Sequence, residues 1–394
     1  MRLLLQETKK IWNPIIVMIL IPFGLVYYVL FSSFYIDYFV NGSNAQADFD
    51  IASEWASEYG TTLDRTEYEK ILLQLEDEKK EFDRMVKEVP EAGENGISSY
   101  TEFDAFQTDY YNTTGQDADP ETERVIWRII GSTNLYRIQS IENFIERYKS
   151  AENKTFSEQY PWAEATDSEI ARVDELQQSE IPFGYIPTGI LDQTFGLIQA
   201  FTVWVIISVV LLLSPTIVRD RLYKVQSTQY AAVTGRRILN VQIGATVLSA
   251  LVLTLLNCLV YGTLMISKGA LVFKDFYLYT PSYIPWVDWS YGTFLLVITA
   301  MEFLLALSSA ILTVLLSRYS SNYIGMLLKA ILFAAVLVFV FGVLVMTQPF
   351  FMLNPTVPEL HEKGMEMWIV LGSLFFAGIM TLISAKFQGR KELL

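Results

Sequence analysis

The chain has 394 residues, of which 52% are hydrophobic, and its formal net charge is −14. This combination is typical of a membrane protein that carries a water-exposed domain, and the acidity excludes nucleic acid as a partner. The charge is unevenly placed. Residues 37–190 hold 33 acidic against 13 basic side chains, a balance of −20, whereas the rest of the chain holds 10 against 16, a balance of +6.

Six hydrophobic stretches are each long enough to cross a bilayer, whose core of about 30 Å needs roughly 20 apolar residues in a helix. They are Ile11–Ile36, Gln193–Val218, Ile238–Ser267, Trp289–Ser317, Ala330–Met346 and Met367–Ala385. The first is too long for the apolar region of a signal peptide, so we expect it to be retained as an anchor. An even number of spans puts both termini on one side.

Positive residues in the short connections predict the orientation, because Lys and Arg are retained on the cytoplasmic side. One side carries 12 of them in four short segments, and the other side has only Lys268, Lys274 and Lys363 in its two short loops. Lys329 lies close enough to the cytoplasmic end to reach the interface. We therefore expect cytoplasmic termini in a multi-pass cell-membrane protein, with residues 37–190 extracellular.

The acidic block reads as a mainly helical domain. An apolar stripe between Thr66 and Val89 is typical of a helix that packs on another helix, with Lys79 in one of its slots. Its members are Tyr68, Leu72, Leu75, Phe82, Val86 and Val89. A second helical pattern covers Glu121–Lys149 with a break at 131–134. The segments 91–99 and 112–120 read as loops.

A third helix of the block is predicted to run to Gln178, with Asp167 capping its first turn. The only cysteine, Cys258, falls inside the third span. The block therefore has no disulfide and must be held by its own core. The fold class expected is an all-α membrane protein with six transmembrane helices and this domain inserted between the first two. The divisions are 1–36, 37–190 and 191–394, the last with a cytoplasmic segment at 219–237.

Several kinds of chemistry have no motif in this sequence. There is no Gly-x-x-x-x-Gly-Lys-Ser/Thr loop for nucleotide phosphates and no nucleophile elbow. The single histidine, His361, lies in a predicted outer loop without a His or Cys cluster, so it reads as a solvated side chain and no metal site is expected. We expect no enzymatic activity and no cofactor in this chain.

The connection between the second and third spans, 219–237, carries a positive signal. Leu222, Val225 and Gln229 have helical spacing, and Gly235 can turn the chain into the next span. A charged surface helix of this kind can be a handle for a cytoplasmic partner. The alternative is a positive-inside retention loop that binds nothing.

In this segment and in its six spans the chain resembles the type-2 ABC transporter permease family. The resemblance rests on Gln6-Glu7-Thr8-Lys9-Lys10 before the first span, on the charged helix after the second, and on the entry Gly235-Arg236-Arg237 into the third. It implies a coupling helix that binds a separate ATPase, which would hold ATP and Mg, and a second permease copy in a homodimer or heterodimer. The coupling residues it implies are Asp220, Leu222, Tyr223, Lys224, Val225, Thr228 and Gln229. The outer block is longer than the first outer loop of many members.

The remaining candidate functional features are two outer loops and two polar side chains. The loop with Phe350, Phe351, Asn354 and Pro355 is apolar yet full of helix breakers, which favours a re-entrant outer gate packed against protein. Eight aromatic residues between 273 and 291 are expected to form an interfacial belt or, alternatively, a substrate-facing surface. Glu302 is the one acid deep in a span and, with Asn257, marks a candidate transport pathway; the alternative is a carboxyl group bonded to neighbouring helices.

The function expected is export of an amphipathic or hydrophobic substrate, such as a peptide, lipid or drug-like molecule, across the cell membrane. The alternative is a membrane-anchored receptor or scaffold whose outer domain binds envelope components or peptides. The excess of negative charge can serve solubility, or it can attract a cationic peptide, as in resistance to antimicrobial peptides.

Overall fold

The computed structural model describes residues 2–113, 119–152, 165–178, 185–223, 238–280, 283–352 and 362–391. These residues are helical apart from turns, loops and three isolated bridges, and they include no strand. Six helices among them are long and apolar enough to cross a membrane. The predicted all-α fold with six candidate membrane spans is therefore confirmed.

The first candidate span is preceded by α1 (Arg2–Ile11), which packs against α14. The span itself consists of α2 (Pro14–Tyr27), a π-helical turn η1 (Tyr28–Ser32) and α3 (Ser33–Asp37). Asn13 caps α2 by accepting the amide of Ile15 at 2.9 Å, and Pro14 occupies the first helical position, where no amide is needed.

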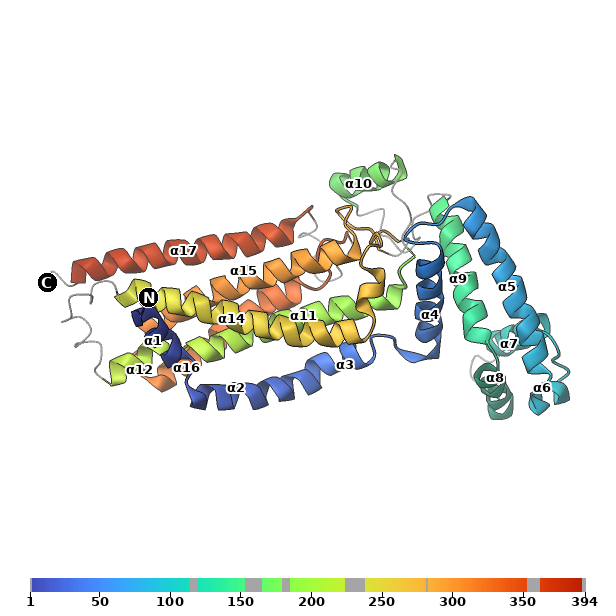
Figure 1. Ribbon diagram of the computed structural model, residues 1–394, viewed down its shortest axis with the longest axis horizontal. Coiled ribbons are helices and arrows are strands. Elements are labelled where there is room, and N and C mark those ends of the chain that lie inside the picture. The colour runs from blue at the N-terminus through green and yellow to red at the C-terminus, as the bar shows by residue number, and fades with distance from the viewer. Residues whose placement is uncertain are drawn as a thin grey trace.

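The other five candidate spans form the rest of an elongated bundle (Figure 1). They are built from α11 (Thr188–Leu213) with α12 (Thr216–Leu222), α14 (Ile238–Ser267), α15 (Tyr291–Arg318), α16 (Tyr323–Leu337) with the π-helical η5 (Val338–Val345), and α17 (Met365–Lys391). A 3₁₀ turn, η4 (Ala270–Phe273), follows α14. The helix α11 is the most buried of the six spans, so it is the central element of the bundle.

The start of α1 and the end of α17 lie at the same end of the bundle, and the helices between the first two spans lie beyond the opposite end (Figure 1). We call these the terminal end and the domain end. The helices there are α4 (Gly42–Glu58), α5 (Arg65–Val86), α6 (Pro90–Glu94), α7 (Tyr100–Thr113), α8 (Pro120–Ser132) and α9 (Leu135–Glu152). A further helix, α10 (Asp167–Gln178), lies beside the domain end.

The helices of the domain end follow local sequence signals. Asp64 and Glu67 form a capping box at the start of α5, with both hydrogen bonds at 2.8 Å. Asp119 caps α8 ahead of Pro120. The break predicted at 131–134 separates α8 from α9 as expected. A common core holds these helices together, and it includes Ile71, Phe82, Val86, Ile126, Ile129, Ile138 and Ile141.

Some local predictions were wrong. Leu72 is exposed and Ile71 is buried instead, because the packed face of α5 lies one residue earlier at that turn. Segment 91–99 is not entirely a loop, since α6 ends at Glu94. The first turn of α10 is capped by Thr166, whose hydroxyl accepts the amide of Glu169 at 3.3 Å, and not by Asp167.

Candidate functional site

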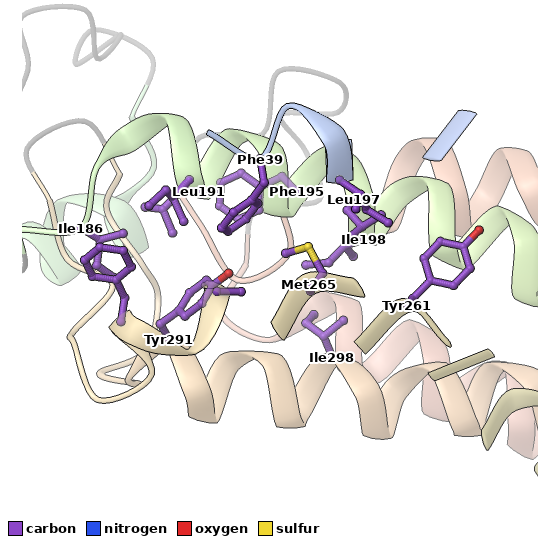
Figure 2. Close-up of a cluster of buried hydrophobic side chains, with 14 of the residues drawn as sticks. Phe39, Ile186, Leu191, Phe195, Leu197, Ile198, Tyr261, Met265, Tyr291 and Ile298 are labelled. Atoms are coloured by element: carbon purple, nitrogen blue, oxygen red, sulfur yellow. The ribbon is translucent and has the colours of Figure 1, made fainter. Parts of the chain in front are cut away.

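Three candidate spans, α11, α14 and α15, enclose a cavity of about 600 Å³. Most of its wall is apolar. Figure 2 shows five of the lining side chains: Leu197 and Ile198 from α11, Tyr261 and Met265 from α14, and Ile298 from α15. Exposed side chains of Ile266 and Leu296 also line it, so the cavity opens on the flank of the bundle.

The charged lining residues of this cavity lie at its two ends. Lys274, Asp275, Ser290 and Thr293 come from the loop after α14 and the start of α15, at the domain end. Glu302 lies on α15 about three turns further along, or about 18 Å at the rise of an α-helix. The cavity therefore runs from polar side chains at the domain end to a buried carboxyl group.

Glu302 is completely buried, and its two carboxyl oxygens have different surroundings. Its Oε1 is in hydrogen-bond contact with the hydroxyl of Thr202 on α11, whereas its Oε2 is buried with no hydrogen-bond partner. The Thr202 hydroxyl also lies 2.9 Å from the carbonyl oxygen of Ile198 and has only one proton to donate. Because a carboxyl group inside a membrane span is costly unless it is paired, this half-paired state marks Glu302 as a candidate functional residue.

Asn257 is not a lining residue of this cavity, although its neighbour Cys258 is. The indole of Trp204 donates to Oδ1 of Asn257 at 3.1 Å, and the amide of Asn257 reaches the hydroxyl of Ser208 at 3.4 Å. Asn257 therefore connects α14 to α11. Of the two pathway candidates, Glu302 lines this cavity and Asn257 does not.

At the terminal end, Asp220 is buried in a network of side chains. Its Oδ2 lies 3.4 Å from Nζ of Lys10 and accepts the amide of Gln242 at 3.1 Å. Lys10 also pairs with the buried Glu7 at 2.6 Å, and Arg219 donates to the carbonyl oxygen of Lys10 at 2.7 Å. These contacts join α12 to α1 and α14.

The next residues of the predicted coupling segment face outward. Leu222 is 45% exposed and Tyr223 is 73% exposed at the end of α12. Arg221 holds this end on the bundle by donating to the carbonyl oxygens of Arg318 and Ser320, each at 2.7 Å. Lys224, Val225, Thr228 and Gln229 lie outside the described residues.

At the domain end, the predicted gate residues Phe350 and Phe351 are buried against the loop that precedes α15. The amide of Trp286 donates to the carbonyl oxygen of Phe350 at 2.8 Å. Phe350 has a φ of +68°, and its amide donates to the buried carboxylate of Glu366 at 2.9 Å, which stabilises this uncommon conformation. Asn354, Pro355 and His361 lie outside the described residues.

Four of the eight aromatic residues between 273 and 291 differ from the expected interfacial belt. Phe273, Phe276, Trp286 and Tyr291 are each at most 2% exposed, so they form part of the protein core and do not face lipid headgroups. Thr194 on α11 is hydrogen-bonded to the hydroxyl of Tyr291 at 2.8 Å. Packing between the loop and α11 accounts for the burial of these aromatic side chains.

Sequence reasoning found Glu302 but missed Thr202 and Glu366. A threonine in a long apolar run carries no distinctive signal, because Thr in a helix usually bonds the preceding turn. Of the two missed residues, only Glu366 had a detectable signal in the sequence, because it is an acid at the edge of the sixth span.

Comparisons of the chain with protein-family models, with curated proteins and with solved structures found no match. The functional argument therefore depends on the geometry of the bundle itself.

Proposed function

We propose that the chain is the permease subunit of an ATP-driven transporter of the type-2 ABC kind, which exports an amphipathic or hydrophobic substrate. The observation that carries this proposal is the cavity among α11, α14 and α15, which has an apolar wall and a buried, half-paired Glu302. An acid within a membrane span is costly to bury, and such residues are known to mark substrate and ion pathways. The Lys and Arg distribution orients the terminal end to the cytoplasm and the acidic domain to the outside.

The terminal end supplies the connection to an energy source. Leu222 and Tyr223 are exposed apolar and aromatic side chains at the point where α12 leads into 224–237. The contacts of Asp220 with Lys10 and Gln242 attach α12 to two other helices. A partner that pushes on this surface would move α12, α1 and α14 together. ATP and Mg belong to that partner, a separate ATPase, and a second permease copy completes the transporter.

The test is co-purification. The chain is expressed with its chromosomal neighbours, purified in mild detergent, and assayed for a co-eluting ATPase and for ATP hydrolysis. Replacing Tyr223, Lys224 and Gln229 together by alanine is expected to remove the ATPase. Tyr111→Ala is the matched control, because Tyr111 is 58% exposed but lies at the domain end. Purification of the intact chain alone, without hydrolysis, refutes the permease proposal.

A receptor or scaffold is the second candidate, and a groove at the domain end favours it. A groove of about 530 Å³ between α4 and α5 is lined by five acids and one lysine: Glu54, Glu58, Asp77, Glu78, Glu81 and Lys70. Their charge suits a cationic peptide, and binding through them would weaken steeply with added salt. Peptide binding that persists when the Tyr223, Lys224 and Gln229 variant has lost the ATPase would separate this role from transport.

A further inference from the structure

We propose that the cavity beside Glu302 binds a hydrophobic primary amine, with the ammonium group on Glu302 and the apolar body among α11, α14 and α15. The transport consequence, that such an amine is a cargo of this protein, rests on the proposed function. The binding site itself rests on the geometry alone.

The wall of the cavity indicates that the ligand has an apolar body. The middle of the cavity is lined by aliphatic and aromatic side chains, and its volume of about 600 Å³ falls in the range of small-molecule pockets. Burying an alkyl or aryl group there removes its apolar surface from water. A strongly hydrated ligand such as a sugar would lose its hydrogen bonds to water along this wall without replacement.

The carboxyl group of Glu302 indicates that the ligand carries an amino group. Its Oε2 is buried and has no hydrogen-bond partner, so it can accept from an N–H group of a ligand. An ammonium group supplies both the missing hydrogen bond and the opposite charge, and charge-assisted hydrogen bonds are about twice as strong as neutral ones. An anionic ligand would be repelled at this end of the cavity.

No protein cation competes for this position among the described residues that line the cavity. Its charged lining residues are Lys274, Asp275 and Glu302. Lys274 and Asp275 lie 3.7 Å apart at the domain end, where the carbonyl oxygen of Lys274 accepts the amide of Gly292, about 15 Å along α15 from Glu302. Ionisation of Glu302 would therefore depend on a ligand for charge compensation.

Gly262 supplies a way to close the cavity without touching its carboxyl group. It lines the wall, and a Cβ atom added there would meet no atom within 4 Å. A side chain at this position therefore starts in open space beside the cavity, and the branched leucine side chain is chosen to fill it. Gly372 on α17 also has no atom within 4 Å of an added Cβ and does not line the cavity, so Gly372→Leu is the matched control.

Cys258 provides the readout, because it lines the cavity and is the only cysteine of the chain. The purified full chain in phosphatidylcholine nanodiscs is treated with N-ethylmaleimide, and alkylation is followed by intact mass. Octylamine is expected to slow the alkylation, whereas 1-octanol, which has the same chain and no charge, is not. The shift in thermal unfolding midpoint that each ligand causes gives a second measure that is independent of thiol reactivity.

Glu302→Gln keeps the shape of the side chain and removes its charge. We expect half-protection by octylamine to need about 10- to 100-fold more ligand in this variant, the usual contribution of a hydrogen bond to a charged group. Gly262→Leu is expected to abolish protection and Gly372→Leu to leave it unchanged. Equal effects of octylamine and octanol on the wild-type chain, or an unchanged octylamine requirement in Glu302→Gln, overturn the proposal.

The outcome is independent of the ATPase test. Octylamine binding by a chain that co-purifies with no ATPase supports the site and refutes the permease role. A co-purifying ATPase together with no amine selectivity overturns the amine site and leaves the permease role supported.

Discussion

Replacing Arg172 by methionine should release α10 from the domain end of the bundle. The Arg172 side chain is 3% exposed, and it donates to the carbonyl oxygen of Pro285 at 3.0 Å and to Glu175 at 2.9 Å, with a further contact to Asp288. Removing one partner of a fully buried ion pair costs about 3–5 kcal/mol. Here Glu175 and Asp288 are 56% and 41% exposed and can return to water, which lowers the expected cost to about 2–3 kcal/mol.

At about 1.4 kcal/mol per factor of ten, this cost raises the open population of α10 about 30- to 150-fold. Hydrogen exchange of amides 167–178, measured by mass spectrometry on the purified full chain, reports that population. Methionine keeps the apolar volume, so Val173 and Leu176 can still pack on Ile284, Trp286 and Met352.

Arg124→Met is the matched control for this experiment. Arg124 is 77% exposed and pairs with Glu121 at 3.5 Å within α8, so its replacement should leave exchange within a few-fold of wild type. Unchanged exchange of α10 in Arg172→Met would show that the apolar contacts alone hold this helix, and the reasoning about the buried guanidinium would be wrong.

Three further predictions concern packing and titration. Phe82→Ala should destabilise the helices of the domain end by about 3–5 kcal/mol, because the ring is fully buried, whereas Leu73→Ala, at a side chain 67% exposed, should cost under about 0.5; hydrogen exchange of α5 distinguishes them. Gly292→Ala should lower the thermal midpoint of the full chain, since its Cβ would lie 2.7 Å from a backbone carbonyl oxygen, and a midpoint equal to wild type would contradict this. Burial raises the pKa of Tyr279 to about 12. The fold favours the neutral phenol, so this stabilisation is complete below pH about 10 and is lost as the pH rises towards 12. The difference between the ultraviolet titrations of wild type and Tyr279→Phe reports the ionisation of Tyr279. Ionisation of this residue near pH 10 would contradict the prediction.

The candidate membrane spans could be predicted closely because length and uninterrupted hydrophobicity determine them. The predicted Ile238–Ser267 coincides with α14, and the predicted Met367 start lies two residues from Met365. The fifth span was predicted too short, beginning at Ala330 where the helix begins at Tyr323, because Lys329 interrupts the apolar run. Lys329 donates to the carbonyl oxygen of Tyr319 at 3.1 Å, so its charge does not end the helix.

The helices of the domain end were only partly predictable. The pattern of α4 is weak, because two of its buried positions, Ala47 and Ala52, are small residues that add little to an apolar stripe. Likewise, α7 buries Phe103 and Tyr110 among polar neighbours and was not anticipated. Tertiary packing stabilises both helices, and a pattern read along one segment does not contain that contribution.

The candidate site was likewise predictable from the sequence only in part. One acid in an apolar span identified Glu302, since a charge in that setting needs a reason. The cavity, the free Oε2 and the role of Gly262 depend on where α11 and α14 lie relative to α15. That relative placement comes from contacts between segments about 50 to 100 residues apart, which no local pattern encodes.

The contact between Lys10 and Asp220 has a consequence for the beginning of the chain. The thirteen residues before the first candidate span would usually be regarded as a dispensable leader, yet α1 is attached through this contact to α12 and packs along α14. Any displacement of α12 must carry α1 with it or break the contact. A tag or truncation placed at the N-terminus therefore acts on the same mechanical unit as the exposed Tyr223 surface, although the two are more than 200 residues apart in sequence.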